Sequence, residues 1–144
     1  MRRCAIMTDK KLNIEIEKYL KSNWNQIIDD ISTLISIPSS INDGKFNKEY
    51  PNGTGSAEAM EQSLKIAKRI GFKTKNHKNV IGIADYQGES KTQIGIIGHC
   101  DVVPPSTGWH FDPYKLNIVN DYLIGRGVLD DKGPTVLFLH AINF

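Results

Sequence analysis

The fold of this chain is decided by the stretch Gly95-Ile96-Ile97-Gly98-His99-Cys100-Asp101-Val102-Val103-Pro104 and by a second stretch, Gly125-Arg126-Gly127-Val128-Leu129-Asp130-Asp131-Lys132-Gly133-Pro134. Residues 94–97 form a short apolar run rich in β-branched side chains, which predicts a strand buried on both faces of a parallel sheet. His99 and Asp101 follow at its carboxyl end. Side chains two apart on an extended chain point to the same face, so these two can converge on one point. Ligand sites of open α/β sheets lie at this end of the strands, and the pattern therefore indicates a metal or ligand site.

The second stretch adds carboxylates in a turn between a strand and a helix. Its glycines at 125 and 127 are typical of a strand exit, and Pro134 is predicted at the first helical position, where its missing N–H costs nothing. Asp130 and Asp131 lie between these two features. By default such residues act as turn and cap residues. A carboxylate at this place is also supported by the helix N-terminus and can bridge two cations about 3.5–4 Å apart.

Both stretches resemble the signature of one enzyme family. The resemblance rests on Gly98-His99-Cys100-Asp101-Val102-Val103-Pro104, Gly108-Trp109, Asp112-Pro113, Gly125-Arg126-Gly127 and Asp130-Asp131-Lys132-Gly133-Pro134. These motifs are similar to those of the di-zinc aminoacylase and carboxypeptidase family, which includes acetylornithine deacetylase and succinyl-diaminopimelate desuccinylase. The segments Ile35-Ser36-Ile37-Pro38-Ser39-Ser40, Tyr50-Pro51 and Gly71-Phe72 extend the similarity to bacterial PepV-type dipeptidases. The resemblance covers roughly residues 12 to 144.

The resemblance implies a role for three residues. His99 matches a zinc ligand, Asp130 matches the carboxylate that bridges two zinc ions, and Asp101 matches the catalytic-site carboxylate that orients the histidine. It also implies that the peptide bond from Asp130 to Asp131 is cis. The expected fold is α/β: the amino-terminal part of a zinc-peptidase catalytic domain, with a mixed sheet flanked by helices. The expected cofactor is Zn²⁺, two ions per complete site, and the expected partner is a small peptide substrate.

Parts of the family pattern have no match in these residues. The family's catalytic base is a glutamate, usually in a Glu-Glu pair downstream of the bridging aspartate, and a further Asp and His complete its ligands. We therefore expect residues 12–144 to be the amino-terminal part of a truncated catalytic domain, with residues 1–11 as a loose N-terminus. The full-length relative is expected to hydrolyse dipeptides, whereas this chain alone is expected to be inactive. The sequence does not indicate which dipeptides are cleaved or the oligomeric state.

Two other classes of protein fit parts of the pattern. One is a non-catalytic α/β binding module or an inactive remnant of such an enzyme, because a single histidine at a strand end is usually a hydrogen-bonded structural residue. The other is a nucleotide-binding domain, suggested by the glycine-rich turns. Gly53-Thr54-Gly55 precedes a helix but lacks the remaining glycine and the Lys-Ser/Thr of a phosphate loop, which disfavours nucleotide binding.

Composition excludes several partners. The net charge of +2 and the pI near 8.5 are mild, and the basic residues are scattered, so we expect no nucleic-acid partner. No apolar run reaches the length of a signal peptide or a membrane span, which predicts a cytoplasmic protein without membrane contact. Cys4 and Cys100 lack C-x-x-C spacing, and no disulfide between them is expected.

Local patterns predict the remaining elements. An apolar stripe from Leu12 to Leu34 predicts a helix, with a possible break at Ser22-Asn23. A second helix is predicted over about 56–70, strands over 72–77 and 80–86, a hairpin over 114–125, and a helix after Pro134. His110 and His140 have no acidic partner at useful spacing, so neither is expected to be a ligand.

Overall fold

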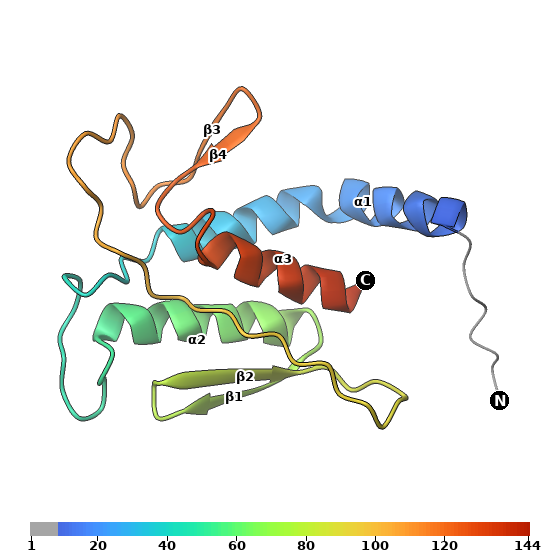
Figure 1. Cartoon of the computed structure of the whole chain (residues 1–144), viewed down its shortest axis with the longest axis horizontal. Coiled ribbons are helices and arrows are strands. Elements are labelled where there is room, and N and C mark those ends of the chain that lie inside the picture. Colours follow the sequence, from blue (N-terminus) through green and yellow to red (C-terminus); the bar gives the residue numbers. More distant parts are fainter. Residues whose placement is uncertain (1–8) are drawn as a thin grey trace.

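The structure is a computed structural model in which residues 9–144 are described. Three helices, α1 (Asp9–Ile35), α2 (Thr54–Arg69) and α3 (Lys132–Asn143), pack against one another, and two β-hairpins lie outside them (Figure 1). Residues 1–8, which include Cys4 and most of the predicted loose N-terminus, lie outside the described residues, and residues 9–11 belong to α1. No helix within residues 9–144 combines the length and the apolar character needed to cross a lipid bilayer.

The first helix is continuous, without the break considered at Ser22-Asn23. Its fully buried residues lie in the carboxyl-terminal half: Ile27, Ile31 and Leu34 are spaced by one helical turn and are all buried. Together with Ile35, Ile66 and Val136 they form the hydrophobic core, where α1 meets α2 and α3. The amino-terminal end of α1 projects beyond the other helices (Figure 1), and Ile14 there is 55% exposed.

The second helix carries the first hairpin. Strands β1 (Lys73–His77) and β2 (Ile81–Asp85) pair antiparallel and pack along α2. Gly82 makes close contact with this helix, because a Cβ there would lie 3.0 Å from the Met60 side chain and 3.1 Å from that of Leu64. The helix and both strands confirm the elements predicted for residues 56–86 to within two residues at each end.

The second hairpin joins β3 (Asn117–Val119) to β4 (Tyr122–Ile124). Asn120 and Asp121 form its two-residue turn with φ of 48° and 65°, the left-handed conformation that such turns require and that Asn and Asp tolerate. The predicted turn is therefore confirmed. The chain then reaches α3, whose first residue is Lys132, so Pro134 occupies the third helical position instead of the predicted first one.

The predicted mixed sheet is not formed. The structure contains two separate two-stranded antiparallel sheets, and the stretch predicted as a buried strand is an extended segment (residues 92–105) that pairs with no strand of the described chain. Ile94 is 87% exposed and Ile97 is 97% exposed, so the prediction of burial on both faces is wrong for these residues. The physical reason is that such a strand needs a neighbour on each edge, and the described strands pair only within their own hairpins.

Candidate metal centre

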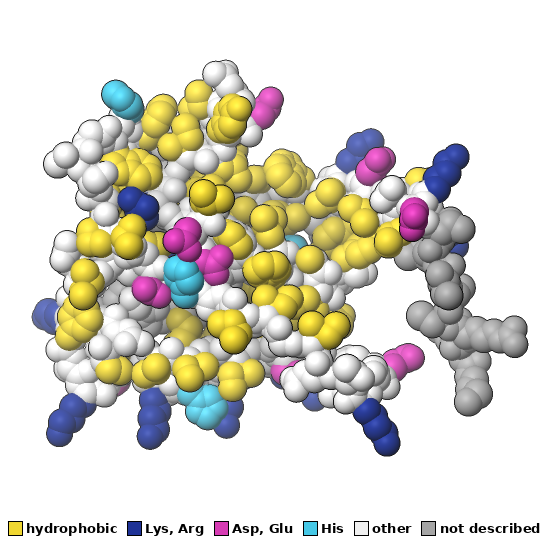
Figure 2. All heavy atoms as spheres, viewed as in Figure 1, with side chains coloured by type: hydrophobic (Ala, Val, Ile, Leu, Met, Phe, Trp, Pro, Cys, Tyr) yellow, Lys and Arg dark blue, Asp and Glu magenta, His cyan; other side chains and the backbone are white. Residues whose placement is uncertain are grey.

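The two predicted ligands lie together. His99 comes from the extended segment and Asp130 from the turn before α3, and the Nε2 atom of His99 is 3.0 Å from the Oδ1 atom of Asp130. On the face shown in Figure 2, acidic side chains gather around a histidine where the extended segment passes the helices. The peptide bond between Asp130 and Asp131 is cis, as the family resemblance implied.

The Asp101 main chain holds the other ring nitrogen of His99. The Nδ1 atom of His99 is 3.0 Å from the Asp101 carbonyl oxygen and 3.6 Å from the Asp101 carboxylate. The main-chain oxygen is therefore the nearer partner, although the carboxylate was the one expected to orient the ring. Partial burial lowers the pKa of His99, but the Asp101 carbonyl and the carboxylates of Asp101 and Asp130 raise it by more, so the pKa is above its usual value.

The facing pair fits two ligands of a zinc ion. Imidazole nitrogen and carboxylate oxygen both bind zinc at about 2.0–2.2 Å, which places two such donors about 3.3 Å apart at a tetrahedral angle. The observed separation of 3.0 Å between His99 Nε2 and Asp130 Oδ1 is close to that value. Among residues 9–144, however, no group of three His, Cys, Asp or Glu side chains is placed to hold one metal ion. The described residues thus provide an incomplete donor set.

The neighbouring acidic and thiol groups are oriented elsewhere. The Asp131 carboxylate accepts a hydrogen bond from the main-chain N–H of His99 at 3.1 Å, and the side chain of Asp101 is 70% exposed. Cys100 is a free thiol whose Sγ lies 3.7 Å from Ser63 Oγ, and burial raises its pKa. Neither Asp131 nor Cys100 faces the His99–Asp130 pair as a third donor.

The loop after α1 supports both halves of the centre. The Ser39 hydroxyl donates to the Cys100 carbonyl at 2.8 Å, and the Ser39 main-chain carbonyl accepts a hydrogen bond from the Val102 N–H at 3.2 Å. On the other half, Lys132 donates from Nζ to the Ile37 carbonyl at 2.6 Å. The Lys132 side chain is fully buried, and burial lowers its pKa to about 8 against the opposing effects of Cys100 and Asp43. The sequence motif contains Lys132, but nothing in the sequence predicts this anchor.

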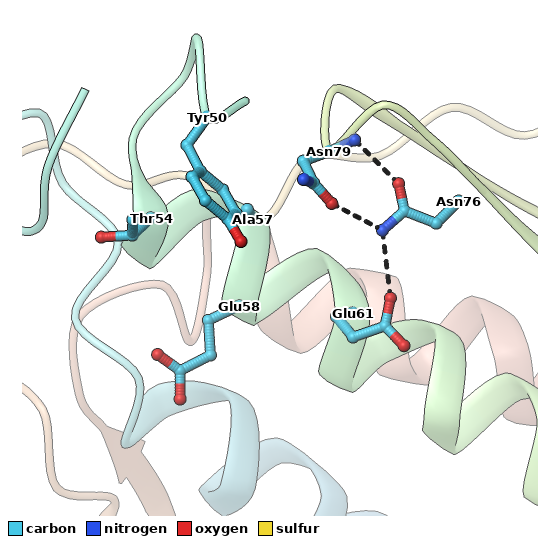
Figure 3. A pocket seen from close by; sticks show the side chains of 7 residues that line it. All are labelled: Tyr50, Thr54, Ala57, Glu58, Glu61, Asn76 and Asn79. Atoms are coloured by element: carbon cyan, nitrogen blue, oxygen red, sulfur yellow. Dashed lines mark hydrogen bonds between the residues drawn. The ribbon is translucent and has the colours of Figure 1, made fainter. Parts of the chain in front are cut away.

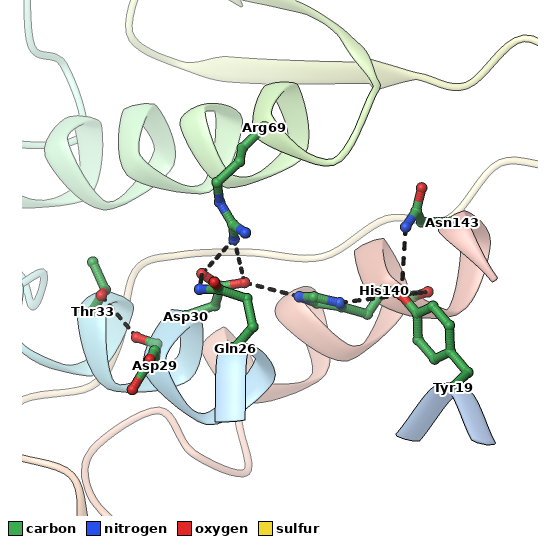
Figure 4. Close-up of polar contacts among 8 residues, drawn as sticks. All are labelled: Tyr19, Gln26, Asp29, Asp30, Thr33, Arg69, His140 and Asn143. Atoms are coloured by element: carbon green, nitrogen blue, oxygen red, sulfur yellow. Dashed lines mark hydrogen bonds and ion pairs between the residues drawn. The ribbon is translucent and has the colours of Figure 1, made fainter. Parts of the chain in front are cut away.

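A second histidine–aspartate pair was missed. The Nε2 atom of His140 lies 2.8 Å from Asp30 Oδ2, and Arg69 contacts both Asp30 oxygens at 2.6 Å (Figure 4). The statement that His140 has no acidic partner is therefore wrong, because the partner is 110 positions away and only the fold brings it near. One signal was present: Asp30 interrupts the buried face of α1, between Ile27 and Ile31.

A shallow cavity of about 440 Å³ lies apart from both pairs (Figure 3). It is formed where α2 meets the turn of the first hairpin, and Asn76 there bonds both Glu61 and Asn79. None of the residues predicted for the site lines it.

The described residues thus form an α/β structure in which a histidine and an aspartate on an open surface fit part of a metal centre. Peptidase family M20/M25/M40 matches residues 95–143. The chain is 39% identical over 126 residues to the Beta-Ala-Xaa dipeptidase of Lactobacillus delbrueckii subsp. lactis, covering 87% of this chain and 27% of that enzyme. It is also 39% identical over 118 residues to a Staphylococcus haemolyticus protein with a provisional dipeptidase name, covering 82% and 25%. The chain belongs to peptidase family M20/M25/M40 and is related to its dipeptidases.

A solved structure shares the fold. The crystal structure of human carnosine dipeptidase 1 matches 90% of this chain with a TM-score of 0.66 and 21% sequence identity. The match covers 30% of the human chain, and this chain likewise spans about a quarter of the length of the curated relatives it matches. The three helices and two hairpins thus correspond to one part of a larger peptidase fold.

Proposed function

We propose that this chain carries part of the catalytic centre of a zinc-dependent dipeptidase, in which His99 and Asp130 are zinc ligands. The observation that supports this most directly is the 3.0 Å approach of His99 Nε2 to Asp130 Oδ1, two donors of the type and spacing that zinc uses. Relatives that carry dipeptidase names support the substrate class, a small peptide. In the complete site two zinc ions would be bound, with Asp130 shared between them.

Each residue of this chain has a limited task in that reaction. Bound zinc would lower the pKa of a water molecule and polarise the peptide carbonyl. The Asp101 carbonyl accepts a hydrogen bond from the Nδ1–H of His99, which leaves the lone pair of Nε2 free to bind zinc. Asp130 contributes a negative charge at the same point, and Lys132 fixes the turn that carries Asp130 by binding the Ile37 carbonyl.

The proposal includes weak metal binding by the isolated chain. Catalytic zinc normally has three protein ligands, whereas only one histidine and one carboxylate face each other here. The proton acceptor of the reaction, a glutamate in the family pattern, has no assigned residue in this chain. We therefore expect the chain alone to bind zinc weakly and to cleave no dipeptide. Metal-dependent cleavage of a dipeptide by the purified chain would overturn this part of the proposal.

Zinc titration of the purified chain tests the ligand assignment. Calorimetry on the parent, on His99→Ala and on Asp130→Ala is expected to show measurable affinity that either substitution removes. His110→Ala is the matched control, because it deletes an exposed imidazole outside the centre. If His99→Ala binds zinc as well as the parent does, the pair is not a metal site and the chain is an inactive relative of the enzymes.

A further inference from the structure

Asp131 directly precedes α3, but its side chain does not cap the helix. An aspartate at this N-cap position usually accepts a hydrogen bond from the second or third N–H of the helix. Here Asp131 makes no side-chain cap hydrogen bond, and its Oδ2 atom instead accepts the main-chain N–H of His99 at 3.1 Å. The Asp131 carboxylate therefore bonds to a residue far away in sequence instead of to an N–H group in the first turn of α3.

Gly98 makes this bond possible by allowing very close approach. A Cβ atom at position 98 would lie 2.9 Å from Asp131 Oδ2 and 2.8 Å from Thr135 Oγ1, closer than side-chain carbons approach such atoms. Thr135 is in the first turn of α3, and its buried Oγ1 atom has no hydrogen-bond partner among residues 9–144. The backbone of the extended segment is therefore pressed against the start of α3 at the residue before His99.

These contacts link the same two stretches twice. His99 is joined to Asp130 through its ring and to Asp131 through its main-chain N–H, so two adjacent aspartates hold one histidine at two points. The side chains of His99 and Asp130 can each rotate about χ1 and χ2, so each is otherwise free to turn away from an exposed partner. The ring of His99 is 48% exposed, so packing alone does not hold it.

We infer that Asp131 is a positioning residue for the proposed zinc ligands: its carboxylate fixes the backbone of His99 opposite Asp130, and Gly98 provides the space. This inference rests on the proposed function, because it concerns the same pair. It adds a residue that is not itself a ligand and assigns it a different task from Asp101, which contacts the ring. Replacing such supporting groups typically weakens metal affinity about 10- to 100-fold.

The test combines two measurements on the whole chain. Asp131→Ala is expected to weaken zinc affinity at least about tenfold, to shift the His99 amide resonance in ¹H–¹⁵N spectra and to speed its hydrogen exchange. Asp131→Asn keeps an acceptor oxygen and is expected to restore most of both properties. Asp29→Ala, which removes an exposed carboxylate from α1, is the matched control and should leave both unchanged.

A second variant covers the case in which Asp131→Ala fails to fold. Gly98→Ala retains the carboxylate but places a methyl group against it, so it should also weaken zinc binding and expose the His99 amide. Helix content by circular dichroism shows whether each variant is folded. Zinc affinity that falls in His99→Ala but is unchanged in Asp131→Ala and Gly98→Ala overturns this inference alone. Zinc affinity that is equal in the parent and His99→Ala overturns the proposed function itself.

Discussion

Within residues 9–144, two histidine–aspartate pairs have nearly the same geometry. In one, His140 Nε2 is 2.8 Å from Asp30 and the two side chains are 4% and 7% exposed. In the other, His99 Nε2 is 3.0 Å from Asp130 and the side chains are 48% and 82% exposed. The buried pair joins helices, whereas the exposed pair joins the extended segment to a turn. The same contact therefore has two different physical settings.

The surroundings separate a structural pair from a candidate binding pair. Arg69 contacts Asp30, and Tyr19 donates its hydroxyl to the His140 carbonyl at 3.1 Å, so the buried pair is enclosed and supplied with partners. Breaking such a pair leaves a buried charge without compensation and is strongly destabilising. Exposed ion pairs contribute little to stability, so stability alone does not account for the arrangement of His99 and Asp130. The difference in burial supports a folding role for the buried pair, and it is consistent with the ligand-binding role that we propose for the exposed pair.

The largest expected effect comes from breaking the buried pair. Asp30→Ala leaves Arg69 and His140 without their shared carboxylate, and we expect the free energy of unfolding to fall by about 3–5 kcal/mol. Urea denaturation followed by circular dichroism measures the loss. Asp29→Ala, one residue away on the exposed side of α1, should change stability by less than about 0.5 kcal/mol. Equal stability of the two variants would remove the distinction between the pairs.

Two isoleucines allow the same comparison of a buried and an exposed region with uncharged side chains. Ile31 is 3% exposed in the helical core and Ile97 is 97% exposed on the extended segment. Ile31→Ala should cost about 2–4 kcal/mol because it leaves a cavity, whereas Ile97→Ala should cost less than about 0.5 kcal/mol. Urea unfolding of both variants provides the comparison. A large loss in Ile97→Ala would mean that the segment is packed in solution.

The buried side chain of Lys132 should make the stability of the folded chain depend on pH. Burial lowers its pKa from 10.5 to about 8, so the folded chain releases the proton more readily than the unfolded chain. The associated penalty is complete below pH 8 and is relieved as the pH rises from about 8 to about 10.5, so stability should rise through this window. Lys132→Met removes the titrating group. Unfolding curves at pH 7, 8, 9 and 10 should therefore show the parent gaining stability relative to the variant, and parallel curves would contradict the prediction.

The smallest effect is expected at the exposed pair. The carboxylates of Asp101 and Asp130 and the Asp101 carbonyl outweigh partial burial and raise the pKa of His99. This stabilisation is present below the ordinary pKa of histidine and is lost as the pH rises through the raised value. In NMR titrations without metal, Asp130→Ala should lower the pH midpoint at which His99 titrates. In urea unfolding, the same substitution should change the free energy of unfolding by less than about 1 kcal/mol. An unchanged midpoint would show that the two side chains do not interact in solution.

Local patterns predicted the helices and hairpins well. The apolar spacing of Ile27, Ile31 and Leu34 fixes one face of α1, and Asn120-Asp121 fixes a turn, because each depends on neighbours in sequence. The motif also predicted that His99 and Asp130 lie together, and their distance agrees. Whether they bind zinc is still a prediction.

Long-range features were beyond sequence reasoning. No spacing rule relates Asp30 to His140, since contact between them depends on how three helices pack. The prediction of a buried strand at residues 94–97 was wrong for a related reason. An apolar run indicates that a segment could be a buried strand, but it does not indicate whether partner strands are present. The hydrogen bond from Lys132 to the Ile37 carbonyl likewise requires knowledge of where the α1 loop returns.

The separation of 110 positions between Asp30 and His140 also delays formation of this pair during synthesis of the chain. At ribosomal rates of about 5–20 residues per second, roughly 5–20 seconds pass between synthesis of the aspartate and synthesis of its histidine partner. Throughout that interval the apolar face of α1 has no α3 to cover it and Asp30 carries its charge without the histidine. Order of synthesis, and not only the folded contacts, therefore decides when the core of this chain can close.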